Sequence, residues 1–141
     1  TLVTYSALAE EGRAFGLPQS SFDKVFDVLD AGLRALEMAH RAGVSIAYGT
    51  DLLGGMHVHQ LRELTIRAQV QPAADILRSV TLVGARLLRM ADRIGRVMPG
   101  MLADLLVIDG DPLSDLALLG RPECVPMIMK GGRVYRDRLC A

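Results

Sequence analysis

The most constraining feature of this sequence is a long amphipathic helix pattern that runs directly into a short β-prone segment. Apolar side chains recur at helical spacing over residues 22–36, and charged side chains occupy the opposite face as far as Arg41. Gly43 follows as a helix-ending glycine, and residues 44–48 (VSIAY) then favour a strand. Because a helix that leads straight into a strand is the second half of a βαβ unit, the sequence predicts an α/β fold.

Weaker patterns predict the elements around this helix and strand. Residues 1–5 (TLVTY) are predicted as the end of a strand, residues 6–19 as a loop with one helical turn, and Ser20 or Ser21 as the helix cap. Further helices are predicted around residues 61–68, 72–80 and 85–90. In the first of these, Glu63 and Arg67 have the i,i+4 spacing of a helix-stabilising pair.

The character of the sequence changes after Asp92. Residues 103–108 (ADLLVI) form a predicted strand that stops at the turn signal Asp-Gly-Asp-Pro. Apolar runs on both sides of Gly131 and Gly132 are typical of a β-hairpin. The sequence therefore predicts an α/β part over residues 1–92 and a β part over residues 93–141.

Composition excludes several classes of function. The 141 residues carry 16 Lys and Arg against 16 Asp and Glu, so the chain has no electrostatic footprint for nucleic acid or an anionic membrane. No apolar run reaches the length of a bilayer span, and no signal peptide opens the chain. We therefore expect no nucleic-acid partner, no membrane partner and a cytoplasmic protein. Cys124 and Cys140 are too few for a disulfide framework, and whether they pair stays open.

Asp51, in the tripeptide Gly-Thr-Asp, is the sharpest candidate for chemistry. It directly follows the predicted strand, and the carboxyl ends of parallel strands are where α/β folds place reactive residues. A carboxylate at that edge can ligate a metal or take a proton from metal-bound water. The alternative is that Asp51 only caps a turn or a helix, and the local residues leave both interpretations open.

Other clusters of polar residues carry weaker signals. His57 and His59 have the spacing that places two ligands on one face of a strand. However, they follow two glycines and precede a helix, so we interpret them as a polar loop or helix start. Asp109, Asp111 and Asp115 lack the spacing of a calcium-binding loop, and we interpret them as turn and capping residues.

The order of these segments resembles the C-terminal portion of an amidohydrolase-superfamily enzyme. Residues 44–51 (VSIAYGTD) resemble the last barrel strand with its metal-site aspartate, and residues 74–90 (ADILRSVTLVGARLLRM) resemble the helical segment that follows it. Residues 94–112 resemble the return into a small β-sandwich, and residues 127–134 (MIMKGGRV) resemble its closing hairpin. The sequence looks most similar to the imidazolonepropionase-like and prolidase-like branch, which hydrolyses C–N bonds in amides, cyclic amides or dipeptides.

The resemblance implies a fold and a role for two residues. A complete (β/α)8 barrel needs about 250 residues, so we expect the C-terminal part of a TIM barrel over residues 1–92 and strands of a small β-sandwich over residues 93–141. Asp51 is implied to ligate a divalent metal, zinc, present as one or two ions in the complete enzyme. It is also implied to relay a proton from the attacking water to the leaving amine. His57 is implied to lie near the substrate, and no other cofactor is expected.

The remaining ligands of the family have no counterpart in this sequence. These are the HxH motif of the first strand, the lysine or glutamate of the fourth strand, and the histidines of the fifth and sixth strands. Because a zinc site takes three or four ligands, we expect the isolated chain to be inactive. The alternative is a non-catalytic interaction fragment that associates through exposed strand edges, with a second copy or with the rest of the barrel.

Overall fold

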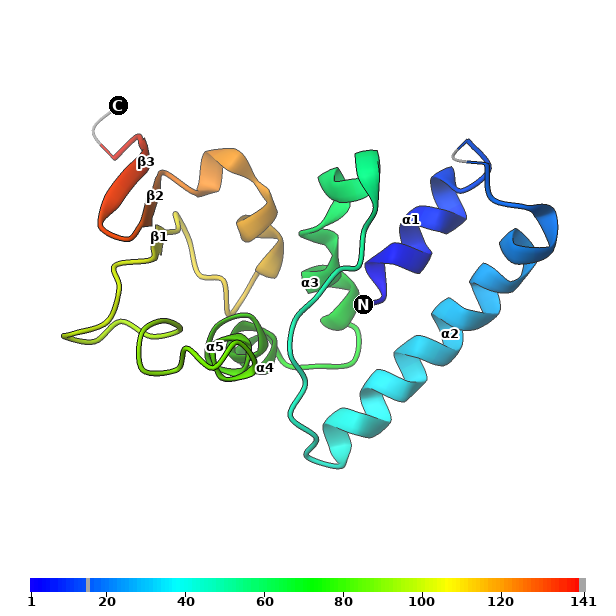
Figure 1. Cartoon of the computed structure of the whole chain (residues 1–141), viewed down its shortest axis with the longest axis horizontal. Coiled ribbons are helices and arrows are strands. Elements are labelled where there is room, and N and C mark those ends of the chain that lie inside the picture. The colour runs from blue at the N-terminus through cyan, green and yellow to red at the C-terminus, as the bar shows by residue number, and fades with distance from the viewer. Residues whose placement is uncertain (15, 140–141) are drawn as a thin grey trace. The chain divides into compact units, whose positions relative to one another are not determined.

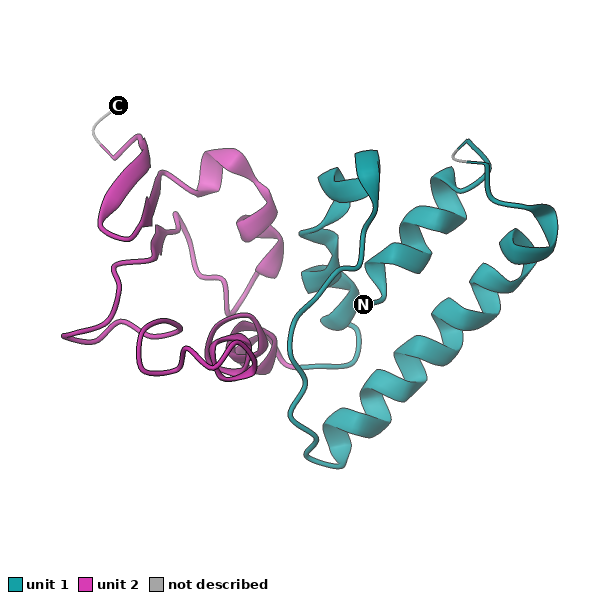
Figure 2. Ribbon diagram, in the orientation of Figure 1, with its two compact units in different colours: residues 1–71 teal, residues 72–141 magenta. Residues whose placement is uncertain are grey.

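The computed structural model describes residues 1–14 and 16–139, which belong to two compact units, Thr1–Gln71 and Pro72–Ala141 (Figures 1 and 2). The helices of the first unit are α1 (Val3–Glu11), α2 (Gln19–Arg41), the 3-10 helix η1 (Gly54–His59) and α3 (Arg62–Arg67). The second unit contains α4 (Ala73–Arg78), the π-helix η2 (Ser79–Val83), α5 (Gly84–Leu87), β1 (Leu105–Val107), the 3-10 helices η3 (Leu116–Gly120) and η4 (Pro122–Cys124), β2 (Met127–Lys130) and β3 (Arg133–Asp137). The two units are groups of residues that contact one another, which is a different criterion from the predicted domain division between residues 92 and 93. That division stays a prediction.

Helix α2 confirms the long amphipathic helix predicted from the sequence. It ends as predicted, because Gly43 adopts a left-handed φ of 71° and donates its N–H to the His40 carbonyl. Its start differs from the prediction. The N-cap is Pro18, without a side-chain cap, and the two predicted caps, Ser20 and Ser21, lie inside the first turn. Proline fixes φ near the helical value, so it can open a helix without a capping side chain.

Helix α1 replaces the strand predicted at residues 1–5, so that prediction was wrong. Val3 and Ala7, one helical turn apart, are both fully buried and pack with Leu52 and Met56. The N–H groups of Leu2 and Val3 have no partner inside the helix and donate instead to the Glu63 carboxylate. A residue 60 positions away from Val3 therefore caps this helix, which no local pattern could reveal.

The strand predicted at residues 44–48 is also absent, and residues 44–53 form neither helix nor strand. A strand is stabilised by hydrogen bonds to a neighbouring strand. Within residues 1–14 and 16–71, the structure contains no strand that could pair with this segment. The predicted βαβ half-unit is therefore not formed by the residues that the structure describes.

The second unit confirms the predicted strand and hairpin. Strands β1, β2 and β3 form one antiparallel sheet in that order, with Leu105 opposite Met129. The turn between β2 and β3 is Gly131–Gly132, and both glycines have positive φ, as the preferred two-residue hairpin turn requires. One sheet does not make a sandwich, so the described residues leave the predicted β-sandwich unconfirmed.

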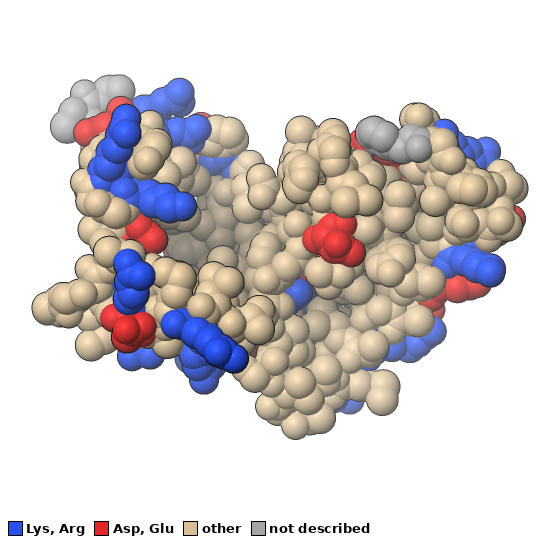
Figure 3. Space-filling model, in the orientation of Figure 1, with Lys and Arg blue, Asp and Glu red and all other residues tan. Residues whose placement is uncertain are grey.

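Charged side chains serve local roles in this second unit. On the face shown in Figure 3, Lys and Arg side chains gather over the β2–β3 hairpin. Arg136 donates to the Pro122 and Val125 carbonyls, which ties the hairpin to η4. Asp111 accepts from the Leu113 N–H, and Asp115 accepts from the Ala117 N–H, which confirms the predicted turn and capping roles. No helix in the described part of the chain is long and apolar enough to cross a membrane.

The helices predicted around residues 61–68, 72–80 and 85–90 are confirmed by α3 and by the run from α4 through η2 to α5. The chain then folds back against this run at Gly95, whose φ is 92°. A Cβ atom at this position would lie 2.8 Å from the Ala85 Cβ and 2.9 Å from the Thr81 carbonyl oxygen. Glycine at position 95 is therefore required by its backbone conformation and by the close approach of the helix.

Alanine substitution at Gly95 tests this close approach. Gly95→Ala should lower the free energy of unfolding by about 2–5 kcal/mol, because a left-handed conformation costs about 1–2 kcal/mol and overpacking costs about 1–3 kcal/mol. The matched control is Gly100→Ala, where φ is 87° but nothing lies within 4 Å of an added Cβ. It should lower stability by only about 1–2 kcal/mol. Urea denaturation gives both values, and equal losses would contradict the packing of residue 95 on the helix.

Candidate functional site

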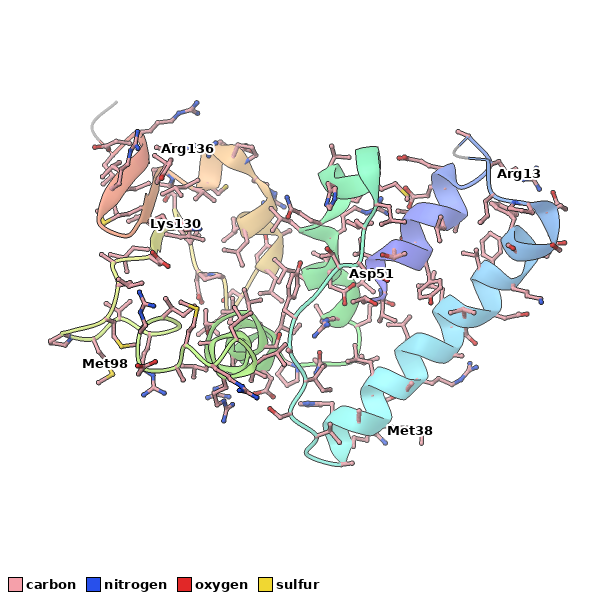
Figure 4. The ribbon with its side chains drawn as sticks, in the orientation of Figure 1. Arg13, Met38, Asp51, Met98, Lys130 and Arg136 are labelled. Carbon is pink, nitrogen blue, oxygen red and sulfur yellow. The ribbon has the colours of Figure 1, made fainter. Side chains whose placement is uncertain are left out.

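Asp51 lies in the irregular segment between α2 and η1, directly before buried Leu52 (Figure 4). Its φ is 52°, a left-handed conformation that non-glycine residues rarely adopt and that Asp tolerates better than most. The side chain is exposed, and within residues 1–14 and 16–139 its carboxylate has no hydrogen-bond or ion-pair partner. The N-cap of η1 is Leu53, so Asp51 does not cap that helix. The carboxylate is therefore free to bind a ligand.

A buried ion pair lies beneath this segment. The Arg67 Nε atom donates to Glu63 Oε1 at 2.7 Å, and the two residues are 2% and 0% exposed. Glu63 Oε2 accepts the N–H groups of Leu2 and Val3 at 2.8 and 2.6 Å. Arg67 Nη2 donates to the Ala47 carbonyl at 3.2 Å. One pair of side chains on α3 thus connects the start of α1 with the segment that leads to Asp51.

Tyr48 adds a second attachment to the same segment. Its ring lies 5.4 Å from the centre of the Arg67 guanidinium, and its hydroxyl donates to the Gln60 carbonyl at 2.6 Å. Burial, and after it the negative charge of Glu63, raises the pKa of Tyr48 to about 12, against the opposing effect of Arg67. The phenol therefore stays protonated near neutral pH and keeps its hydrogen to donate.

Helix α1 holds the residue that immediately precedes Asp51. The hydroxyl of Thr4 donates to the Thr50 carbonyl. On the other side of Asp51, Leu52 is 4% exposed and belongs to the core formed with Val3 and Ala7. Both neighbours of Asp51 are thus attached to α1, which leaves little freedom to the backbone between them.

His57 and His59 do not form the metal-binding pair that their spacing allows. Both lie in η1, where residues two apart point in different directions. His59 Nε2 lies 2.7 Å from Glu11 Oε1, and Arg62 on α3 bonds to the Glu10 carboxylate. These contacts join η1 and α3 to α1. The structure thus assigns His59 to the fold, whereas His57 is exposed and keeps its predicted role only as a prediction.

A zinc site requires more ligands than the described residues bring together. Zinc takes three or four protein ligands from Cys, His, Asp and Glu. The described residues contain no group of three such side chains that could hold an ion. The carboxylate of Asp51 has the chemistry of one metal ligand, and residues 1–14 and 16–139 bring no second and third ligand beside it. Cys140 lies outside the described residues.

Reasoning from the sequence identified the i,i+4 spacing of Glu63 and Arg67 but not their burial. Such a pair is most often a solvent-exposed feature of a helix. The signal that distinguishes this pair is its long-range hydrogen bonding to Leu2, Val3 and Ala47, which exists only in the folded unit.

Comparison with known proteins identifies the family. The amidohydrolase family matches residues 6–135. This chain belongs to the amidohydrolase family. The crystal structure of an amidohydrolase is 46% identical, with a TM-score of 0.92 over 99% of this chain and 34% of that one. A prolidase solved in complex with N-methylphosphonate-L-proline is 40% identical, with a TM-score of 0.90 over 97% of this chain and 34% of that one.

Two curated relatives extend the comparison. Ochratoxinase from Aspergillus niger is 29% identical over 92% of this chain and 27% of its own length. Imidazolonepropionase from Bacteroides thetaiotaomicron is 32% identical over 67% of this chain and 24% of its own length. The predicted resemblance to the imidazolonepropionase-like and prolidase-like branch is confirmed. The chain spans about a third or less of these relatives, which imply a TIM-barrel fragment with mixed α/β content.

The backbone conformation of Asp51 is open to a direct test. Asp51→Ala should lower the free energy of unfolding by about 1–2 kcal/mol, because alanine tolerates a left-handed φ poorly. Asp51→Asn should leave it nearly unchanged, since Asn tolerates that conformation as Asp does. Asp27→Ala, at an exposed position of α2, is the control and should change stability by less than about 0.5 kcal/mol. Equal stability of the Ala and Asn variants at residue 51 would contradict the left-handed backbone.

Proposed function

We propose that this chain is part of a metal-dependent amidohydrolase that cleaves C–N bonds in amides, cyclic amides or dipeptides, with Asp51 as its catalytic and metal-binding residue. The observation that carries the proposal is the free Asp51 carboxylate, held in a left-handed backbone between two anchored neighbours. Membership of the amidohydrolase family supports hydrolysis. The solved prolidase, 40% identical and bound to a proline derivative, supports a dipeptide with proline as substrate.

The reaction adds water to the carbonyl carbon and breaks the bond from that carbon to nitrogen. A divalent metal, zinc in this proposal, would be held in part by Asp51 and would lower the pKa of a bound water to about 7. Asp51 would accept one proton from the attacking water as the O–C bond forms. It then donates that proton to the departing nitrogen, so a neutral amine leaves and Asp51 is again a carboxylate. An exposed carboxylate without an internal partner is suited to both transfers.

We propose that the rest of the site is supplied from outside this chain. We propose that other strands of the barrel provide the remaining ligands for one or two metal ions. His57, exposed on η1 and six residues after Asp51 in the sequence, is proposed to contact the substrate. The hairpin of β2 and β3 is proposed to belong to a small β-sandwich. A cytoplasmic location and self-association also stay predictions.

A second candidate function is an interaction fragment without catalysis. It is favoured by the edge position of β1 in the sheet and by the exposure of Leu106 on that strand, at 56%. An unpaired edge with apolar side chains can accept a strand from another chain. Concentration-dependent association without any hydrolysis by the intact protein would favour this function over the first.

Substitution of Asp51 in the intact protein tests the proposed chemistry. Asp51→Asn keeps the shape and the backbone preference but removes the proton acceptor, so kcat should fall by about 10²- to 10⁴-fold. Release of proline from Xaa-Pro dipeptides measures the rate, and circular dichroism checks the fold. Asp27→Asn on α2 is the matched control and should retain full activity. Near-normal turnover by Asp51→Asn would exclude this residue from the mechanism.

Metal analysis of the isolated 141-residue chain tests whether the remaining metal ligands come from outside this chain. With one candidate ligand, the chain should retain far less than one equivalent of zinc after dialysis and should release no proline from Xaa-Pro dipeptides. Inductively coupled plasma mass spectrometry measures the metal. Tight binding of one equivalent of zinc that persists in Asp51→Ala would show that the chain holds a different site. Stoichiometric zinc that depends on Asp51 would overturn the expected inactivity of the isolated chain.

A further inference from the structure

We propose that Arg67, through its buried ion pair with Glu63, is a positioning residue that fixes the location of the Asp51 carboxylate. This inference rests on the proposed hydrolytic function and extends it to residues that touch neither substrate nor metal. Arg67 and Glu63 lie on α3, 16 and 12 positions after Asp51, and both are almost completely buried. Their role follows from what each of their polar atoms bonds.

The contacts of the pair reach the segment before Asp51 by two routes. Arg67 bonds to the Ala47 carbonyl and lies over the ring of Tyr48, so it holds the segment before Asp51. Glu63 holds the first two amides at the start of α1. Helix α1 in turn holds Thr50 through the hydroxyl of Thr4. The segment before Asp51 is thus attached to the ion pair both directly and through α1.

The Asp51 side chain depends entirely on this backbone for its location. Its carboxylate bonds to nothing among the described residues, so no side-chain contact fixes it. The left-handed φ at Asp51 directs the chain from anchored Thr50 into buried Leu52. A small shift of residues 47–50 therefore moves the carboxylate by a similar amount. Such shifts matter, since a misplacement of about 1 Å can reduce a rate by about 100-fold.

The chemistry of the pair favours positioning over simple stabilisation. A buried ion pair contributes little net stability, and apolar residues of similar size often stabilise as well. The pair also leaves the Nη1 atom of Arg67 buried without a partner, which further lowers its contribution to stability. Arginine fixes the geometry of two bonds at once, because its planar guanidinium donates to Glu63 through Nε and to the Ala47 carbonyl through Nη2. Lysine carries the same charge but cannot make both bonds in that fixed geometry.

Arg67→Lys in the intact protein is the test. The variant retains a positive charge beside Glu63 but loses the bond to Ala47 and the contact with the Tyr48 ring. We expect kcat to fall about 10- to 100-fold while KM changes less than about twofold, because substrate contacts are untouched. Arg34→Lys is the matched control. Arg34 pairs with Asp30 at the same i,i+4 spacing, but both side chains are more than half exposed, so its kinetic constants should not change.

Hydrogen exchange separates positioning from a general loss of stability. In Arg67→Lys, amide exchange measured by mass spectrometry should rise in peptides that cover residues 47–52 and stay unchanged in α2. A purely structural role would instead raise exchange throughout the first unit. If Arg67→Lys does not fold, Thr4→Val serves as a second variant, since it removes the bond to Thr50 and leaves the ion pair intact. It should lower kcat without a change in KM.

The outcomes distinguish this inference from the function on which it rests. Wild-type kcat and unchanged exchange at residues 47–52 in Arg67→Lys, beside an inactive Asp51→Asn, would overturn the positioning role and leave the function standing. A fall in kcat together with a rise in KM of similar size, with increased exchange across the first unit, would also overturn the positioning role. Full activity in Asp51→Asn would instead overturn the proposed function, and with it any role of Arg67 in that reaction.

Discussion

The buried ion pair of Glu63 and Arg67 connects parts of the first unit that are far apart in the sequence. Two buried charges are tolerated only when hydrogen bonds satisfy them, and removal of one partner leaves the other uncompensated. Here Glu63 uses one oxygen for Arg67 and the other for two amides of α1, while Arg67 also bonds to Ala47. The placement of α1 and of the segment before Asp51 therefore depends on the same interaction.

This arrangement explains how the carboxylate of an exposed aspartate can lack side-chain contacts and still be fixed in position. Most side chains are located by their own contacts, but those contacts would occupy the oxygens that a metal or a proton needs. The Asp51 carboxylate has no such contacts among the described residues, and the backbone around it is anchored by Thr4 and by the burial of Leu52. The cost is a left-handed residue, which Asp accepts more readily than most side chains.

The family relationship shows that this chain corresponds to part of a larger protein. The chain spans about a third or less of its relatives, and its described residues offer no group of three metal-ligating side chains. In the proposed enzyme, the chain contributes one accurately placed ligand and proton carrier to a site that other barrel strands complete. The absent strand at residues 44–48 agrees with this view, because a barrel strand requires neighbours on both sides.

Local patterns in the sequence determined the elements that need only local forces. The helical spacing of α2, the glycines of the β2–β3 turn and the capping aspartates all act within a few residues, so the sequence predicted each of them. The family and the identity of Asp51 as the candidate also came from the sequence. Tertiary structure decided three things: that α1 is a helix, that residues 44–48 lack a strand, and that Glu63 and Arg67 are buried. Each depends on groups many residues apart, such as the Glu63 carboxylate on the amides of α1, and long-range contacts of this kind leave no periodic trace in the sequence.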